Sequence, residues 1–130
     1  MSKAENISLV RRLYESGAAP EIIKELFSSD IVWDIAPGFP KGGIYYGHDS
    51  TMKDFFGQFM PLFASWSTEP REYYGDEDNH VFVLGEYHGV GKDGRKADVR
   101  FSHLWTVRDG KLIALKQCAD SYPAQQLLTN

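Results

Sequence analysis

Residues 97–119 carry the clearest structural signal in the chain, and they read ADVRFSHLWTVRDGKLIALKQCA. Two runs rich in apolar residues, 97–108 and 111–119, are joined by Asp109-Gly110. An Asp-Gly pair between two such runs is a strong signal for a tight β-hairpin. We therefore expect two long antiparallel strands in this part of the chain.

Two more strands are expected before this hairpin, at residues 68–74 and 80–89. A second Asp-Gly pair follows them and leads into the strand at 97–108. The sequence thus predicts a four-strand antiparallel meander. The strands at 80–89 and 97–108 have apolar side chains on both faces, so we expect one face to meet helices and the other to meet another molecule.

The N-terminal part of the chain predicts two short helices and a strand. Apolar residues at helical spacing predict a helix over 6–16, with the inward stripe Ile7, Val10, Leu13 and Tyr14. Gly17 ends this helix, and Pro20 suits the first turn of a second helix over 20–27. The β-branched run at 31–35 predicts a strand.

An irregular stretch and a third helix separate this strand from the meander. Residues 36–48 hold two prolines, four glycines and several large apolar residues. We expect them to form a mobile lid, with Phe39, Tyr45 or Tyr46 closing a cavity. The third helix is expected to start near Asp49 and to end at Pro61, with the apolar stripe Met52, Phe55, Phe56, Phe59 and Met60.

Length and composition limit the class of protein. A chain of 130 residues is the size of one domain, and we expect a single domain over residues 1–130. Its 42% hydrophobic and 25% charged residues are typical of a globular protein. A net charge of −4 without a basic cluster argues against nucleic acid as a partner. The apolar runs are too short to span a membrane.

The N-terminus and the single cysteine indicate the compartment. The first residues lead into a charged amphipathic segment, which is unlike the apolar region of a signal peptide. Cys118 is the only cysteine and has no partner for an internal disulfide, which fits a reducing environment. We expect a cytoplasmic protein.

The order of these elements and five short segments resemble the SnoaL-like and ketosteroid isomerase-like branch of the nuclear transport factor 2-like superfamily. The resemblance covers about residues 5–128, and the segments that carry it are 10–15, 31–34, 46–49, 103–111 and 117–120. Each segment is loose by itself. The five together, in order and at this spacing, are specific for the fold.

The resemblance implies an α+β fold with the topology α-α-β-α-β-β-β-β. In this cystatin-like fold a cone-shaped, curved antiparallel β-sheet wraps around three helices and encloses a deep apolar pocket. The resemblance also implies a homodimer that forms through the outer face of the sheet. Known members include isomerases, polyketide cyclases, dehydratases, epoxide hydrolases and non-catalytic binding modules, so the fold leaves the function open.

Asp34 is the first candidate for a catalytic group. It follows the apolar residues Ile31, Val32 and Trp33 directly. A carboxylate that enters an apolar pocket has a raised pKa, which suits a general base near neutral pH. The resemblance places the base of ketosteroid isomerase-like enzymes here. The alternative interpretation is a solvated residue at the end of a strand.

Tyr14 is the second candidate, because it lies on the inward stripe of the first predicted helix. The resemblance implies a tyrosine near this position that donates a hydrogen bond to a substrate oxyanion. A buried phenol needs a hydrogen-bond partner, and a substrate oxygen is one option. A core tyrosine bonded to Asp34 or to a backbone carbonyl is the other.

The strand before Asp109 contributes further candidates. Arg100 and Ser102 share one face of this strand, and His103 lies on the other. The resemblance implies an acid at the position of Ser102 in isomerases and epoxide hydrolases, and serine is not an acid. His103 and Asp120 are similar to the acid–base pair of the polyketide cyclases. The alternative places His103 at a dimer face.

These residues leave two classes of function open. The first is a cofactor-free acid–base enzyme of the isomerase, cyclase or dehydratase type, acting on a mostly apolar organic substrate such as a carbonyl compound. The second is a non-catalytic ligand-binding or dimerisation module. The candidate catalytic residues are Asp34, Tyr14, His103 and Asp120. The candidate substrate-binding residues are Trp33, Phe39, Tyr45, Phe55, Phe59, Arg100, Ser102 and Gln117.

Two further observations on the sequence argue against a bound cofactor and against a metal ion. Residues 89–94 match the glycine pattern G-x-G-x-x-G, but they lie in a predicted hairpin rather than before a helix that could receive a pyrophosphate. The four histidines lack the short spacings of zinc ligands. We therefore expect neither a bound cofactor nor a metal ion.

Overall fold

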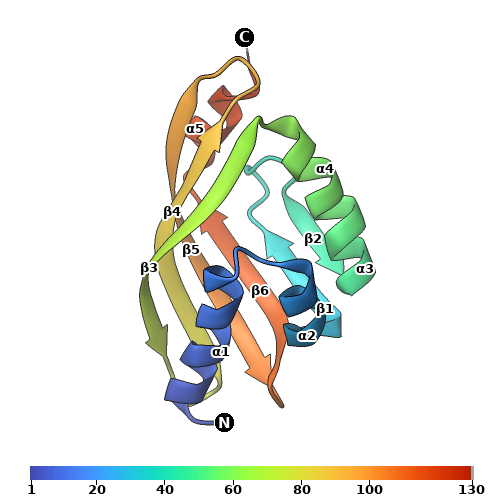
Figure 1. Cartoon of the computed structure of the whole chain (residues 1–130), viewed down its shortest axis with the longest axis vertical. Helices are drawn as coiled ribbons and strands as arrows, with labels where there is room; N and C mark the ends of the chain where they lie inside the picture. Colours follow the sequence, from blue (N-terminus) through green and yellow to red (C-terminus); the bar gives the residue numbers. More distant parts are fainter. Residues whose placement is uncertain (130) are drawn as a thin grey trace.

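Six strands form one curved sheet in the order β2-β1-β6-β5-β4-β3 (Figure 1). The computed structural model describes residues 1–129 of the chain. The strands are β1 (Phe27–Ile35), β2 (Gly43–Tyr46), β3 (Ser65–Gly75), β4 (His80–Val90), β5 (Lys96–Arg108) and β6 (Lys111–Ala119). The α+β fold and the antiparallel meander from β3 to β6 are as predicted.

The sheet is mixed, which corrects the expectation of a wholly antiparallel one. Strands β1 and β6 run parallel, and all other neighbours are antiparallel. A parallel pair needs a long connection, and here most of the chain lies between the two strands. The meander therefore meets the N-terminal part of the sheet along this parallel pair.

Helices cover one face of the sheet (Figure 1). They are α1 (Lys3–Glu15), α2 (Pro20–Leu26), a continuous helical segment from residue 48 to residue 62, and a short C-terminal helix α5 (Ser121–Gln126). The helical segment consists of α3 (His48–Ser50), the π-helical turn η1 (Thr51–Phe56), α4 (Gly57–Phe59) and the 3-10 turn η2 (Met60–Leu62). The three predicted helices are present; α5 was not predicted.

No helix among residues 1–129 is long and apolar enough to cross a bilayer.

Helix α1 begins at a capping box, which fixes the direction of the helix. The Ser2 hydroxyl accepts the backbone N–H of Glu5, and the Glu5 carboxylate accepts the N–H of Ser2. Leu9, Val10 and Leu13 are buried on the side that faces the sheet. Tyr14 extends this side toward β5.

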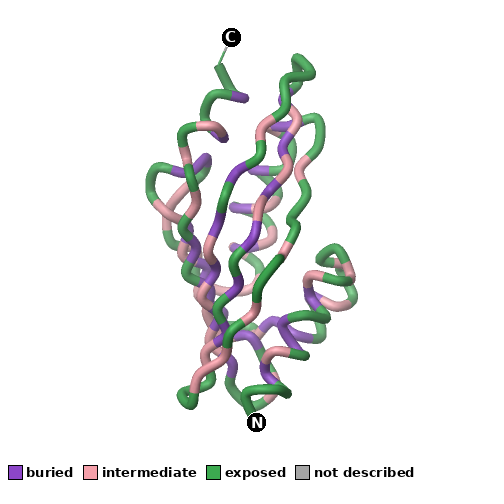
Figure 2. Tube along the Cα trace, turned by 90° about the vertical axis from the view of Figure 1, so that its left-hand side faces the viewer, coloured by how far each residue is buried: buried purple, intermediate pink, exposed green. Residues whose placement is uncertain are grey.

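Buried and accessible residues alternate along the central strands (Figure 2). In β5 the residues Phe101, His103, Trp105 and Val107 are buried on the inner face, toward the helices. Because side chains alternate between the faces of a strand, Arg100, Ser102 and Leu104 lie on the outer face. This face assignment decides which predicted residues reach the interior.

The stretch at residues 36–48 is more regular than predicted. Residues 43–46 form β2, and Tyr45 of this strand lies opposite Trp33 of β1. The turn before β2 is tight: a Cβ at Gly42 would lie 2.2 Å from the carbonyl oxygen of Ala36. Only glycine fits there, and the turn brings β2 back onto the edge of the sheet.

Candidate functional site

An interior cavity of about 440 Å³ lies between the inner face of the sheet and the helices. Its wall is mostly aliphatic and aromatic, and of the described residues that line it none is an aspartate, glutamate, lysine or arginine. The exposed lining residues Gly17, Ala18, Met60, Ser67 and Thr68 mark where the cavity meets solvent. Such a space suits a small, mostly apolar molecule.

A chain of polar side chains crosses the wall of this cavity. The Tyr14 hydroxyl lies 2.5 Å from Nδ1 of His103, and the Tyr87 hydroxyl lies 2.6 Å from Nε2 of the same ring. The indole N–H of Trp105 donates to the Tyr14 oxygen over 2.9 Å. The Nε2 amide of Gln117 donates to the Tyr87 oxygen over 3.1 Å. His103 is therefore bridged between two tyrosines.

Four different elements bring these side chains together. Tyr14 comes from α1, Tyr87 from β4, His103 and Trp105 from β5, and Gln117 from β6. The Phe101 ring stacks on His103 with their centroids 4.1 Å apart. This contact restricts the imidazole to the plane in which both nitrogens face a tyrosine hydroxyl.

Burial changes the acid–base properties of the three groups in the same direction, toward the uncharged form. It lowers the pKa of His103 to about 3 and raises the pKa of Tyr14 well above its ordinary value. It also raises the pKa of Tyr87. An apolar environment disfavours an imidazolium or a phenolate. Near neutral pH His103 is thus a neutral imidazole between two neutral phenols, those of Tyr14 and Tyr87.

The opposite wall is aromatic, and it is built largely by the helical segment from residue 48 to residue 62. All five residues of its predicted apolar stripe line the cavity: Met52, Phe55, Phe56, Phe59 and Met60. The turn η1 is π-helical, and such turns frequently occur at functional sites. The Phe59 ring packs against Phe39 and Trp66, with centroids 5.5 and 5.0 Å apart.

Most of the predicted site residues line this cavity. They are Tyr14, His103, Trp33, Phe39, Phe55, Phe59 and Gln117. The position of His103 in the interior favours the acid–base interpretation of this residue over a place at an outer dimer face. The catalytic and binding roles of all these residues stay predictions.

Asp34 does not line the cavity, which corrects its predicted placement. Its neighbours in β1, Trp33 and Ile35, point inward and are buried. Alternation therefore turns the Asp34 side chain to the outer face, where its backbone lies between Ile44 and Lys116. The apolar run before Asp34 indicated a pocket but not which face of the strand enters it.

Arg100, Ser102 and Asp120 also lie away from the interior. All three line a separate open groove of about 530 Å³ on the outer face of the sheet. Asp120 follows β6 at the start of α5 and is exposed, so it does not pair with His103. Tyr45 packs its ring on Phe55 and donates its hydroxyl to the Lys41 carbonyl, behind the cavity wall.

The sequence reasoning missed Tyr87, which is the central partner of His103. Its signal was present, because Val81, Val83, Gly85 and Tyr87 share one face at the strand period of two. The buried valines mark that face as the inner one. A face assignment for residues 80–89 would have placed the Tyr87 hydroxyl in the interior.

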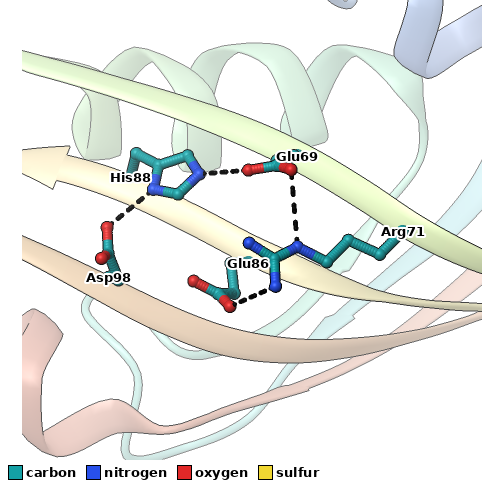
Figure 3. Close-up of polar contacts among 5 residues, drawn as sticks. All are labelled: Glu69, Arg71, Glu86, His88 and Asp98. Atoms are coloured by element: carbon teal, nitrogen blue, oxygen red, sulfur yellow. Dashed lines mark hydrogen bonds and ion pairs between the residues drawn. The ribbon is translucent and has the colours of Figure 1, made fainter.

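A second polar cluster lies on the outer face, over β3, β4 and β5 (Figure 3). His88 lies between Glu69 and Asp98, with both nitrogen–oxygen distances at 2.7 Å. Arg71 pairs with Glu86 at 2.9 Å and contacts Glu69 at 3.4 Å. Charge-assisted hydrogen bonds to Asp98 and Glu69 raise the pKa of His88. These charges balance one another on an exposed surface.

The geometry of the fold agrees with the comparison to protein families, in which a SnoaL-like domain matches residues 10–115. The chain belongs to the SnoaL-like family. No protein with curated function matches its sequence significantly.

Solved structures resemble this SnoaL-like chain over nearly their full lengths. TerC co-crystallised with polyporic acid has 25% identity and a TM-score of 0.86, with 97% of this chain and 99% of TerC covered. A nuclear transport factor 2-like protein of Burkholderia pseudomallei has 24% identity and a TM-score of 0.83, with both chains fully covered.

A protein of Jannaschia sp. assigned as a SnoaL-like polyketide cyclase has 16% identity and a TM-score of 0.82. The two chains are covered over 98% and 93% of their lengths. At this identity the similarity shows the fold alone, and this fold is the one that was predicted from the sequence.

Proposed function

We propose that this SnoaL-like protein binds a mostly apolar organic molecule in its interior cavity and catalyses cofactor-free acid–base chemistry on it, of the isomerase, cyclase or dehydratase type. The observation that carries the proposal is the bridging of His103 between Tyr14 and Tyr87 in a wall of the cavity. The complex of TerC with polyporic acid supports the choice of an organic ligand.

The chemistry of the bridge follows from the neutrality of its members. A buried imidazolium is unfavourable, so His103 serves best when it accepts a proton at one nitrogen while it gives one from the other. Tyr14 can then donate its hydroxyl proton to a substrate oxygen and recover a proton from Nδ1. Tyr87 gives its hydroxyl proton to Nε2 and takes a proton from another position of the substrate.

In this sequence every proton is accounted for. The substrate loses one proton at the Tyr87 end and gains one at the Tyr14 end, so the product is an isomer of the substrate or, in a reaction of the dehydratase type, the product and the released water together have its composition. No net charge enters the cavity. Because the described lining residues include no ionised side chain, a reaction without charge separation is the one that this wall favours.

A second function has a specific observation in its favour. The described lining residues include no carboxylate, which is the usual strong base for removing a proton from carbon. A non-catalytic binding module that holds the same ligand would need only the apolar wall and the hydrogen bonds. Deuterium uptake separates the two functions.

The ligand site is tested by a screen of organic molecules, polyporic acid included, for compounds that raise the Tm. The same screen is run on Thr68→Trp, which fills the opening of the cavity, and on Ser65→Trp, which places the same ring on the same strand outside the cavity. Compounds should stabilise the wild type and Ser65→Trp but not Thr68→Trp. Equal stabilisation of all three proteins would contradict the interior site.

The acid–base function is tested by incubating each stabilising compound with the protein in deuterium oxide. An enzyme should accelerate deuterium uptake at carbon or convert the compound to an isomer, and His103→Gln should lose this acceleration while it still binds. Binding without any deuterium uptake or product would favour the non-catalytic module.

The compartment belongs to the proposal as well. Cys118 is an exposed, free thiol, and an exposed thiol persists best under reducing conditions. We place the activity in the cytoplasm on this ground.

A further inference from the structure

The hydrogen bonds around His103 leave little freedom in how the two tyrosine oxygens are used. The indole N–H of Trp105 is a donor only, so the Tyr14 oxygen must accept it. The backbone N–H of Ala36 donates to Oε1 of Gln117 over 3.2 Å, which fixes the amide orientation. Nε2 of Gln117 therefore faces Tyr87, and the Tyr87 oxygen must accept as well.

A neutral imidazole has one N–H group and one bare nitrogen. In the first arrangement Nδ1 carries the proton and donates to Tyr14, while the Tyr87 hydroxyl donates to Nε2. In the second arrangement Nε2 carries the proton and donates to Tyr87, while the Tyr14 hydroxyl donates to Nδ1. The two contacts with His103 are satisfied equally well in both arrangements.

Each arrangement leaves one hydroxyl proton without an acceptor. Tyr14, Tyr87 and His103 hold three exchangeable protons between them, and their two mutual contacts use only two. The spare proton belongs to Tyr14 in the first arrangement and to Tyr87 in the second. Neither hydroxyl has another acceptor among the described residues, and both tyrosines line the cavity.

We propose that the bridge presents a single hydroxyl proton to the cavity, that an uncharged ligand with an acceptor oxygen such as a ketone binds it, and that the ligand selects whether Tyr14 or Tyr87 presents it. This inference rests on the ligand site proposed above. It adds the chemical class of the ligand and a switch between two donors.

The switch leaves one proton on each tyrosine and changes no charge, because water that enters the cavity exchanges a proton with each of them. Tyr14 gives its spare proton to water as it takes the Nδ1 proton, and Tyr87 gives its proton to Nε2 as it takes one from water. Each O–H or N–H bond that breaks is replaced by one that forms, and the reverse transfers restore the first arrangement. The ring needs no rotation, because its nitrogens already lie 2.5 and 2.6 Å from the two oxygens.

The wall also explains why the ligand should be uncharged. The described lining residues offer no lysine or arginine to pair with an anion and no carboxylate to pair with a cation. An ion that left water for this wall would lose its hydration without a counter-charge. A ketone loses little on transfer and gains one directed hydrogen bond.

Two small probes of the same shape test the donor. Acetophenone and α-methylstyrene differ only in an oxygen that replaces a CH₂ group. All three tryptophans of the chain line the cavity, so their indole N–H signals in NMR spectra report binding directly. The quantity of interest is the ratio of the two affinities, compared between the wild type and the double variant Tyr14→Phe/Tyr87→Phe. The ratio removes differences in hydrophobicity and cavity size.

The ratio of ketone affinity to hydrocarbon affinity should fall about fivefold in the double variant, as expected for one lost hydrogen bond. An unchanged ratio would show that neither tyrosine hydroxyl donates to the ketone, and it would leave the proposed ligand site in place. If neither probe moves any tryptophan signal of the wild type up to its solubility limit, the ligand site itself fails, and the inference fails with it.

A measurement on the wild type keeps the inference testable if the double variant does not fold. The ¹⁵N signals of His103 report which nitrogen carries the proton. Acetophenone should shift the population toward one tautomer, and α-methylstyrene should leave it unchanged. The same response to both probes, or two protonated nitrogens near pH 7, would overturn the inference.

Discussion

The Tyr87 hydroxyl lies 2.6 Å from Nε2 of His103, although their backbones are not paired with each other. Between them in the register is the pair Gly85 and Phe101. The Phe101 ring stacks on both residues, with centroids 4.6 Å from Tyr87 and 4.1 Å from His103. Because Gly85 has no side chain, it leaves space for this ring. The geometry of the bridge at His103 therefore depends on a glycine at position 85.

Gly85→Ala should therefore destabilise the protein. The new Cβ would lie 2.2 Å from the Glu69 carbonyl oxygen and 2.8 Å from Cζ of Phe101, and relieving such contacts costs about 1–3 kcal/mol. Urea unfolding measures the loss. Gly38→Ala is the control, since its Cβ would meet Ser121 Oγ at an ordinary 3.7 Å. Equal effects of the two substitutions would contradict this packing.

His103 should make the protein less stable as the pH falls below about 6.5. Its folded pKa of about 3 lies below the value of about 6.5 in an unfolded chain, so between these values only the unfolded state binds the proton. The contribution is fully present above pH 6.5 and is lost progressively toward pH 3, by on the order of 4 kcal/mol.

Unfolding free energies measured from pH 7 to pH 4.5 check this, because most carboxylates remain ionised in that range. His103→Gln, which cannot titrate there, should give a flatter curve than the wild type. Parallel curves for the two proteins would show that His103 is not buried in its neutral form.

His88 should act in the opposite direction. Hydrogen bonds to Asp98 and Glu69 raise its folded pKa, so its stabilising charge is fully present below about pH 6.5 and is lost as the pH rises through the folded value. His88 is 39% exposed on its side chain, so solvent screens the pairs and the effect is small.

The measurement is the unfolding free energy between pH 6 and pH 9 for the wild type and His88→Gln. The wild type should lose its advantage over the variant as the pH rises. An advantage that stays constant over this range would mean that folding does not raise the pKa of His88.

The fold could be predicted from local signals, whereas the site could be predicted only in part. Asp-Gly turns and the stripe from Met52 to Met60 are encoded by neighbouring residues, and their spacing fixes strand and helix directly. The bridge at His103 depends on contacts such as the one with Tyr14, which lies 89 positions away. No local pattern encodes such a distance.

The misplacement of Asp34 has a different cause. A shift of one residue in the face assignment of a strand moves every side chain to the other side of the sheet. The run before Asp34 has apolar residues on both faces, so it does not indicate which face is buried. The pairing with β2 and β6, which turns Trp33 inward, decides the outcome.

The outer face of the sheet should join two copies of the chain. Tyr74, Phe82 and Leu84 are 52%, 43% and 38% exposed on this face, next to Leu104 on β5. Exposed apolar patches of this kind commonly mark protein interfaces. Sedimentation at micromolar concentration should give twice the mass of one chain.

Leu84→Glu should convert this dimer to a monomer, because it places a charge from each copy in an apolar contact. Tyr122→Glu on α5, which changes a more exposed apolar residue outside the sheet, should remain dimeric. A wild-type monomer, or a dimer that is insensitive to Leu84→Glu, would contradict this interface.

The central claim is that His103 is a neutral imidazole held between two phenols in the interior. An NMR titration of the ¹⁵N-labelled imidazole from pH 8 down to the acid limit of the folded state tests it most directly. The account predicts that His103 stays neutral through pH 5, in line with a pKa of about 3, and that it has one protonated and one bare nitrogen. Protonation with a midpoint near pH 6.5, as for a solvated histidine, would contradict it.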